Sequence, residues 1–221
     1  MAENQDTWPR VIAIDGPAGA GKGTLANRLA DAFDMAVLDT GLIYRATGFA
    51  VLEAGGDPAD PAAALDAARN LDMTKIDESA LRNETVADAA SKVAVMPDVR
   101  AELLAFQRRF AANPPDGKSG AILDGRDIGT VVCPDADVKL FVSASVEVRA
   151  DRRFKELQGK GQTVIYARVL EDLKARDERD TGRATAPMKP ASDAFELDTS
   201  DLDADGVFAE VMTFINSKRP Q

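Results

Sequence analysis

The sequence of 221 residues contains no histidine and a single cysteine, Cys133. The absence of histidine excludes imidazole general-base catalysis and histidine-ligated metal sites, so any chemistry must depend on Lys, Arg, Asp and a bound metal ion. A single cysteine cannot form an internal disulfide, which favours a reducing, cytoplasmic location. Cys133 precedes Pro134 in an apolar stretch, which indicates a packing role.

Long apolar runs and an excess of basic residues are also absent. No stretch approaches the roughly 20 consecutive apolar residues that a membrane helix needs, so no membrane partner is expected. The polar segment 1–9 lacks an apolar signal core and is predicted to be flexible. The net charge of −10 argues against nucleic acid as a partner. A nucleotide site in such an acidic protein must gather its cations locally.

A glycine-rich segment stands between an apolar run and an amphipathic one. The run Val11–Asp15 predicts a strand, and Leu25, Leu29 and Phe33 recur at helical spacing. A strand, a glycine-rich turn and a helix form the framework of a phosphate-binding loop. The residues expected to bind the phosphates are Gly16, Pro17, Ala18, Gly19, Ala20, Gly21, Lys22, Gly23 and Thr24.

The chemistry of this segment suits a nucleoside triphosphate. Glycines let successive backbone amides approach phosphate oxygens, and the following helix directs its positive end at the same anion. Lys22, expected as an exposed loop residue, supplies charge at the β- and γ-phosphates, while the Thr24 hydroxyl would bind Mg²⁺ directly or through water. Because Gly23 separates these two residues, the loop resembles that of nucleoside-monophosphate kinases more than that of GTPases. The alternative is a tight turn without a ligand.

Short apolar runs alternate with longer amphipathic segments, which is typical of a parallel sheet flanked by helices. Strands are predicted at Arg10–Asp15, Ala36–Asp39, Ala121–Asp124, Val138–Val142 and Phe195–Leu197. Helices are predicted at Lys22–Phe33, Leu42–Ala54, Pro61–Asn70, Thr85–Val95, Pro97–Ala112, Val146–Gly159, Val164–Asp180 and Asp203–Asn216. The pattern therefore predicts an α/β fold of the P-loop NTPase type, a three-layer α/β/α arrangement with a five-stranded parallel sheet.

Polar residues gather where two of these strands end, the edge at which parallel sheets bind ligands. Asp124 suits a metal-bound water, and Arg126 suits a phosphate because guanidinium grips phosphate oxygens in pairs. The alternatives are a helix N-cap for Thr40 and a loop that simply faces water. The candidates at the two strand ends are Thr40, Tyr44, Arg45, Asp124, Arg126 and Asp127.

Two later segments are rich in arginine. The simplest interpretation of Arg149, Arg152 and Arg153 is a solvated helix face with helix-spaced ion pairs. The second segment, 176–183, runs off a predicted helix into a glycine, where its side chains can project into a cleft.

Four motifs occur in order: Gly-Pro-Ala-Gly-Ala-Gly-Lys-Gly-Thr, Asp-Thr-Gly-Leu-Ile-Tyr-Arg, Asp-Gly-Arg-Asp-Ile-Gly-Thr-Val-Val and Arg-Asp-Glu-Arg-Asp-Thr-Gly-Arg. Together they resemble bacterial-type cytidylate kinase over nearly the whole chain from Arg10 onward. The resemblance implies a monomer that transfers the γ-phosphoryl group of ATP to CMP or dCMP with Mg²⁺. It also implies one kinase domain, 10–221, with a core (10–71 and 113–221), an acceptor-side segment (72–112) and a mobile lid at about 149–183.

The resemblance assigns roles to individual residues. Those expected in catalysis are Lys22, Asp124, Arg126 and Arg176. Those expected to hold the acceptor's phosphate and sugar are Thr40, Tyr44, Arg45, Arg126, Arg176, Asp180 and Arg183. Those expected to read cytosine are Ser91, Arg100 and Asp127. In one departure, only residues 72–83 stand where bacterial members carry a mostly β insert, so a reduced insert is expected.

Two other functions remain open from the residues. Another small-molecule P-loop kinase, such as an adenylate or shikimate kinase, shares a similar loop, although the later motifs argue against it. A GTPase-like switch is a more distant alternative, because Thr74–Asp77 superficially resembles a guanine-reading motif. That segment does not follow an apolar strand, which argues against the switch.

Overall fold

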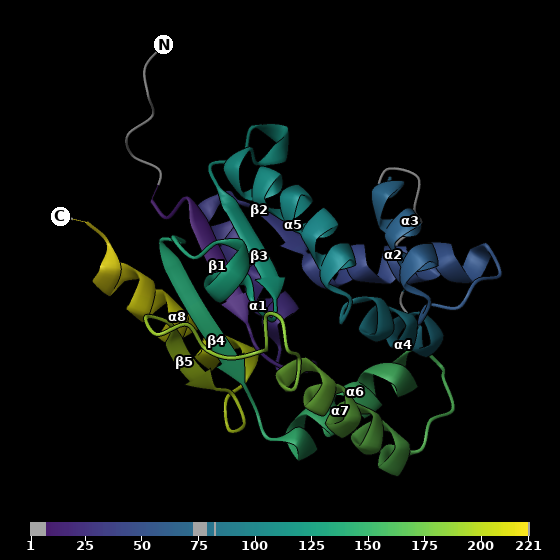
Figure 1. Cartoon of the computed structure of the whole chain (residues 1–221). Coiled ribbons are helices and arrows are strands. Elements are labelled where there is room, and N and C mark those ends of the chain that lie inside the picture. The colour runs from purple at the N-terminus through teal and green to yellow at the C-terminus, as the bar shows by residue number, and fades with distance from the viewer. Residues whose placement is uncertain (1–7, 73–78, 82, 221) are drawn as a thin grey trace. The chain divides into compact units, whose positions relative to one another are not determined.

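The computed structural model describes residues 8–72, 79–81 and 83–220. Its centre is a five-stranded sheet in the order β2-β3-β1-β4-β5 (Figure 1). The strands are β1 (Val11–Asp15), β2 (Ala36–Asp39), β3 (Ala121–Gly125), β4 (Val138–Ser143) and β5 (Phe195–Asp198). Strand β1 pairs in parallel with β3 and β4, and β4 pairs in parallel with β5. The predicted five-stranded parallel sheet is thus confirmed.

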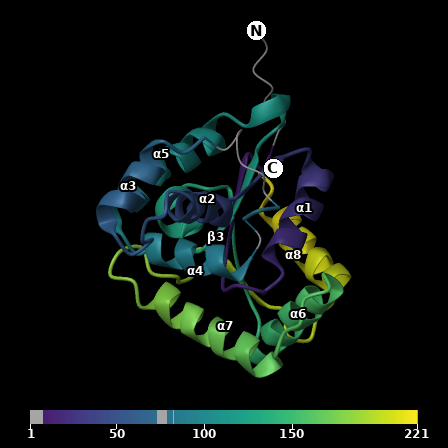
Figure 2. The ribbon, with the colours of Figure 1, turned by 90° about the vertical axis from the view of Figure 1, so that its right-hand side faces the viewer.

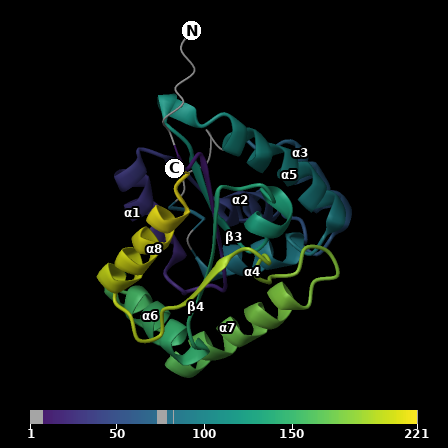
Figure 3. The same ribbon diagram turned by 90° about the vertical axis from the view of Figure 1, so that its left-hand side faces the viewer.

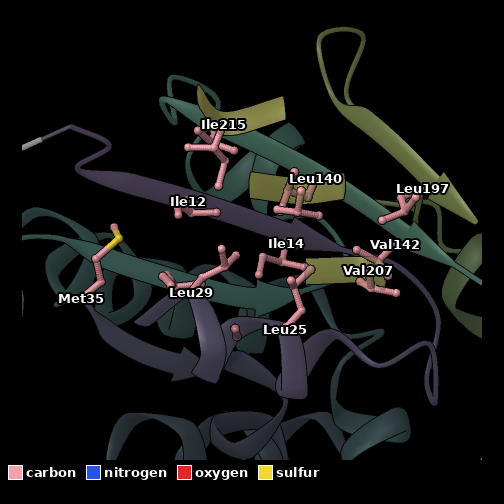
Figure 4. Close-up of a cluster of buried hydrophobic side chains, with 14 of the residues drawn as sticks. Ile12, Ile14, Leu25, Leu29, Met35, Leu140, Val142, Leu197, Val207 and Ile215 are labelled. Carbon is pink, nitrogen blue, oxygen red and sulfur yellow. The ribbon is translucent and has the colours of Figure 1, made fainter. Parts of the chain in front are cut away.

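Contacts between Cα atoms divide the chain into two compact units, 1–38 with 111–221, and 39–110. In the first unit, helices α1 (Lys22–Phe33) and α8 (Ala204–Lys218) pack on the sheet. Apolar residues of both helices share one buried cluster with the strands, as Figure 4 shows for Ile12, Leu25 and Ile215. At the rim, Arg28 of α1 donates to Ala204 O, which ties the two helices together.

Two further helices of the first unit form a hairpin. Helices α6 (Val146–Gly159) and α7 (Tyr166–Thr181) lie side by side in both rotated views (Figures 2 and 3). They bury a small apolar cluster of their own, which an edge-to-face contact between Phe154 and Tyr166 extends. This hairpin contains most of the predicted lid, whose mobility stays a prediction.

Two short helices of the first unit were not predicted from the sequence. A 3₁₀-helix, η2 (Pro115–Gly117), precedes β3, and a π-helix, η3 (Ile128–Val132), follows it. Each is a single turn, too short to produce a periodic apolar pattern. The π-helix immediately follows Asp127 and so bears directly on the site.

The described residues of the second unit are mostly helical. Its helices are α2 (Thr40–Glu53), α3 (Pro61–Arg69), α4 (Glu84–Val93) and most of α5 (Pro97–Ala112). Helix α2 packs so closely on α4 at Gly48 that a Cβ atom there would lie 2.9 Å from the Ala89 backbone. The predicted acceptor-side segment 72–112 belongs largely to this unit. Most of the expected reduced insert, 72–83, lies outside the described residues. The segment Thr74–Asp77 lies outside them as well.

Candidate functional site

The glycine-rich loop leaves the carboxyl end of β1 in a conformation that requires glycine. Gly16 has φ +140°, and a Cβ atom there would lie 1.9 Å from Val142 O on the neighbouring strand β4. Gly21 has φ +93° and is the N-cap of α1. Another residue at Gly16 would clash with β4, and another residue at Gly21 would be strained by the left-handed backbone conformation.

The amino end of α1 differs from those of most other helices. Asp39, Asp60 and Asp203 cap α2, α3 and α8 by accepting backbone amides. Gly21 makes no side-chain cap for α1, and the first turn of α1 contains no acidic residue. Because the first amides of a helix have no intrahelical acceptor, this end is suited to bind an anion such as a phosphate.

Lys22 is buried, not exposed as predicted from the sequence. It is the first residue of α1, its side chain is 6% exposed, and its Nζ donates to Pro17 O at 2.9 Å. The same Nζ lies 3.6 Å from Asp124 Oδ1 at the end of β3. A side chain in the first turn of a helix points back toward the amino end, which folds the lysine over its own loop. Lys22 thus places a cation inside the loop.

The residues near this lysine offer few direct metal ligands. Thr24 is exposed in the first turn of α1, and Asp124 is mostly buried. Within the described ranges, no group of three or more acidic or cysteine side chains could enclose a metal ion. This donor set fits Mg²⁺, which usually keeps several waters and takes further oxygens from bound phosphates.

Arginines that are far apart in sequence meet at one buried carboxylate. Asp180 is 2% exposed and accepts from Arg126 Nε at 2.8 Å and from Arg183. Arg176 Nε lies 4.0 Å from the same carboxylate. Burial would raise the pKa of Asp180, but Arg126, Arg183 and Arg176 together hold that pKa below its ordinary value of 3.8. With three cations around one anion, the cluster keeps an excess of positive charge that suits a phosphate group.

Arg149 does not lie on a solvated face, which was the simplest interpretation of its sequence. It is buried, and its guanidinium donates to Ala18 O of the glycine-rich loop and to Ala144 O, each at 3.0 Å. It also pairs with Asp177 of α7. Arg152 is likewise engaged, because it donates to Thr199 O at 2.6 Å. The sequence contained no signal for these contacts, which join segments up to 131 positions apart.

Apart from Asp127, the remaining predicted residues lie in the second unit. Thr40 is the buried first residue of α2, and the N-cap is Asp39, whose Oδ1 accepts from Gly41 N at 2.9 Å. Arg45 of α2 donates to Leu81 O at 3.0 Å.

Two residues proposed to read the base lie on the next helices. Arg100 of α5 donates to Ala94 O at 3.3 Å, and its guanidinium stands 5.7 Å from the centre of the Tyr44 ring. Ser91 is buried in α4. The structure thus brings Arg100 and Tyr44 together, a contact that the sequence alone did not reveal.

A parallel sheet, a glycine-rich loop with a buried lysine and an arginine cluster define a P-loop kinase. A gluconokinase from Sinorhizobium meliloti 1021 has a similar fold, with a TM-score of 0.52 at 13% identity, covering 95% of this chain and 93% of that one. The family model for cytidylate kinase matches residues 12–217. The chain belongs to the cytidylate kinase family.

Curated relatives extend this similarity over nearly the full length. A cytidylate kinase from Paramagnetospirillum magneticum is 64% identical over 209 residues, covering 95% of this chain and 99% of the relative. One from Methylocella silvestris is 56% identical over 207 residues, covering 94% of each. None of the helices in the described ranges has the length and hydropathy that crossing a bilayer requires.

Proposed function

We propose that this chain is a cytidylate kinase that transfers the γ-phosphoryl group of ATP to CMP or dCMP, giving CDP or dCDP and ADP. The observation that carries this proposal is the uncapped amino end of α1 behind a glycine-rich loop, with Lys22 folded over it. Membership of the cytidylate kinase family supports the choice of acceptor. We propose that the chain acts as a monomer in the cytoplasm.

On the ATP side, the backbone amides of 16–24 would hold the phosphates, and Lys22 would bind the β- and γ-phosphates. Thr24 would hold Mg²⁺ together with phosphate oxygens, and Asp124 would hold one of its waters. When bound, Mg²⁺ neutralises charge on the phosphates.

On the acceptor side, different residues would bind different parts of CMP. The cluster of Arg126, Arg176 and Arg183 around Asp180 would bind the phosphate and sugar. Thr40, Tyr44 and Arg45 are also proposed to bind the phosphate. The cytosine ring would be read by Ser91, Arg100 and Asp127.

The transferred phosphoryl group passes through a loose transition state, so catalysis is mostly alignment and electrostatic stabilisation. Lys22 and the arginines supply that charge from preorganised positions. No histidine base is needed. Closure of the lid, 149–183, would exclude water and thereby suppress hydrolysis of ATP.

The test is a product assay with ATP at fixed concentration and a panel of acceptors: CMP, dCMP, UMP, AMP and shikimate. We expect ADP together with CDP or dCDP, and much slower turnover of AMP and shikimate. A second arm contains GTP without an acceptor. Acceptor-independent hydrolysis of GTP, or preferential use of AMP or shikimate, would contradict the proposal.

A further inference from the structure

Asp15, the last residue of β1, makes a contact that the proposed chemistry does not use. Its carboxylate is buried and accepts two backbone amides, Ile128 N at 2.7 Å and Gly129 N at 2.8 Å. These amides open the π-helix η3, and the first amides of a helix have no acceptor within it. Asp15 therefore caps this helix although it lies 113 positions before Ile128 in the sequence.

The capped helix begins directly after the two residues that are proposed to bind CMP in this loop, Arg126 and Asp127. Asp127 is buried, and its carbonyl accepts from Val131 N at 2.9 Å and Val132 N at 3.2 Å. The backbone that carries both side chains is thus held on one side by the π-helix and on the other by β3. Fixing the first amides of the helix fixes the turn from which the two side chains project.

The carboxylate is costly to keep at this position. Burial, with a smaller effect of Asp127, raises the pKa of Asp15 to about 6, against the opposing effects of the Gly129 and Ile128 amides and of Lys22. From β4, the aliphatic part of Lys139 packs against Gly129. Because the folded-state pKa is above the ordinary 3.8, ionisation of Asp15 opposes folding increasingly as pH rises from about 4 to 6. A neutral side chain would avoid this cost, so stability alone does not explain an aspartate at this position.

We propose that Asp15 is a positioning residue, whose two hydrogen bonds to η3 hold the Arg126–Asp127 turn in the geometry that binds the acceptor nucleotide. This role rests on the proposed function. Asp15 acts through the backbone of residues 128 and 129 and does not touch the reacting phosphates. Its loss should therefore weaken use of CMP far more than binding of ATP.

The chain provides a matched control for the test. At the opposite end of β1, Asp137 Oδ2 also accepts two backbone amides, Arg10 N at 2.8 Å and Val11 N at 2.9 Å. Asp15→Asn keeps one acceptor oxygen but turns an NH₂ group toward the second amide. Asp137→Asn also replaces a carboxylate by an amide, away from the proposed site, where one oxygen accepts both backbone amides.

We expect Asp15→Asn to lower kcat/KM for CMP roughly tenfold to hundredfold, the scale of one lost hydrogen bond to a charged group, and to leave KM for ATP within about twofold. Asp137→Asn should leave both values near those of the unsubstituted chain. If the two variants lose CMP activity equally after correction for folded fraction, the positioning role is overturned. If the unsubstituted chain forms no CDP, the proposed function itself fails.

A second measurement does not depend on the variant folding or on any nucleotide. In ¹H–¹⁵N spectra of the unsubstituted chain, the Ile128 and Gly129 amides should shift with a midpoint near pH 6, where Asp15 titrates. A flat response at Ile128 and Gly129 would overturn the contact. Since phosphate monoesters also titrate near pH 6, pH–rate profiles are informative only as differences between variants, where the substrate's contribution cancels.

Discussion

The arginines proposed to bind the acceptor make different contacts in the two units. In the first unit, Arg126, Arg176 and Arg183 surround the buried carboxylate of Asp180. In the second unit, Arg45 and Arg100 donate to main-chain carbonyls, Leu81 O and Ala94 O. A carboxylate partner orients a guanidinium strongly and cancels part of its charge, whereas a carbonyl orients it more weakly.

This difference suggests a division of labour within the proposed acceptor site. The arginines around Asp180 are set in place before any phosphate arrives, so they meet it with little reorganisation. Arg45 of the second unit, which is proposed to bind the phosphate, would exchange its bond to Leu81 O for one to a phosphate oxygen. Stability should therefore depend on the carboxylate of the first unit, while affinity should depend on both units.

The largest effect is expected from Asp180→Asn, which removes the charge that balances three arginines. Breaking a buried ion pair from one side costs roughly 3–5 kcal/mol in the free energy of unfolding. The control is Asp193→Asn. Asp193 pairs with Lys139 from an exposed position, so its loss should lower the free energy of unfolding by only about 0–1 kcal/mol. Urea unfolding of both variants makes the comparison, and equal losses would contradict the role of the cluster.

The stability difference between Asp180→Asn and the unsubstituted chain should also depend on pH. The pKa of Asp180 is lowered in the folded protein, so its stabilising effect is present above pH 3.8 and is lost as pH falls through the lowered value. The stability gap between Asp180→Asn and the unsubstituted chain should therefore narrow on acidification through this range. A gap that stays constant down to pH 2 would show that the charge of Asp180 is not what stabilises the cluster.

Lys22→Ala should have the next largest effect, because it removes a buried cation from the phosphate loop. We expect kcat to fall on the order of 10²–10³-fold, as for loss of one preorganised donor. Since Lys22 is buried and bonded to Pro17 O, unfolding free energy should also fall by roughly 1–3 kcal/mol. Lys118→Ala is the control, because Lys118 pairs with Asp34 in an exposed position. Unchanged kcat in folded Lys22→Ala would refute the role of the lysine.

Asp127→Ala and Ser91→Ala should show whether both units read the base. Each should lower kcat/KM for CMP, with a loss of transition-state stabilisation of roughly 1–3 kcal/mol for each unpaired group. KM for ATP should change little. Initial rates with CMP and UMP make the measurement. A rise in KM for ATP with KM for CMP unchanged would assign the altered residue to the ATP side.

The smallest stability effect is expected from Arg45→Met, which retains the apolar stem of the side chain. Loss of its bond to Leu81 O should lower the free energy of unfolding by roughly 0.5–1.5 kcal/mol, well below Asp180→Asn. KM for CMP should nevertheless rise, since the charge proposed to bind phosphate is gone. A loss of stability as large as that of Asp180→Asn would erase the contrast between the units.

Where the sequence pattern was regular, it predicted the structure closely. The helices Lys22–Phe33, Pro97–Ala112 and Val146–Gly159 have the predicted bounds at both ends. Helix α7 begins at Tyr166, two residues later than predicted, because Ile165 has an extended backbone and serves as the N-cap. The apolar pattern continues through a cap residue, so it does not mark where the helical backbone starts.

The parallel sheet, the glycine-rich turn after β1 and the family were predictable from the sequence alone. Each depends on local signals: alternation of apolar runs, glycines at fixed spacing and four motifs in order. The folded structure was needed to show that Lys22 and Arg149 are buried, that a π-helix follows Asp127, and that Asp15 caps it. These features depend on contacts between segments that are distant in the chain, and local patterns contain no information about which distant groups will meet when the sheet assembles.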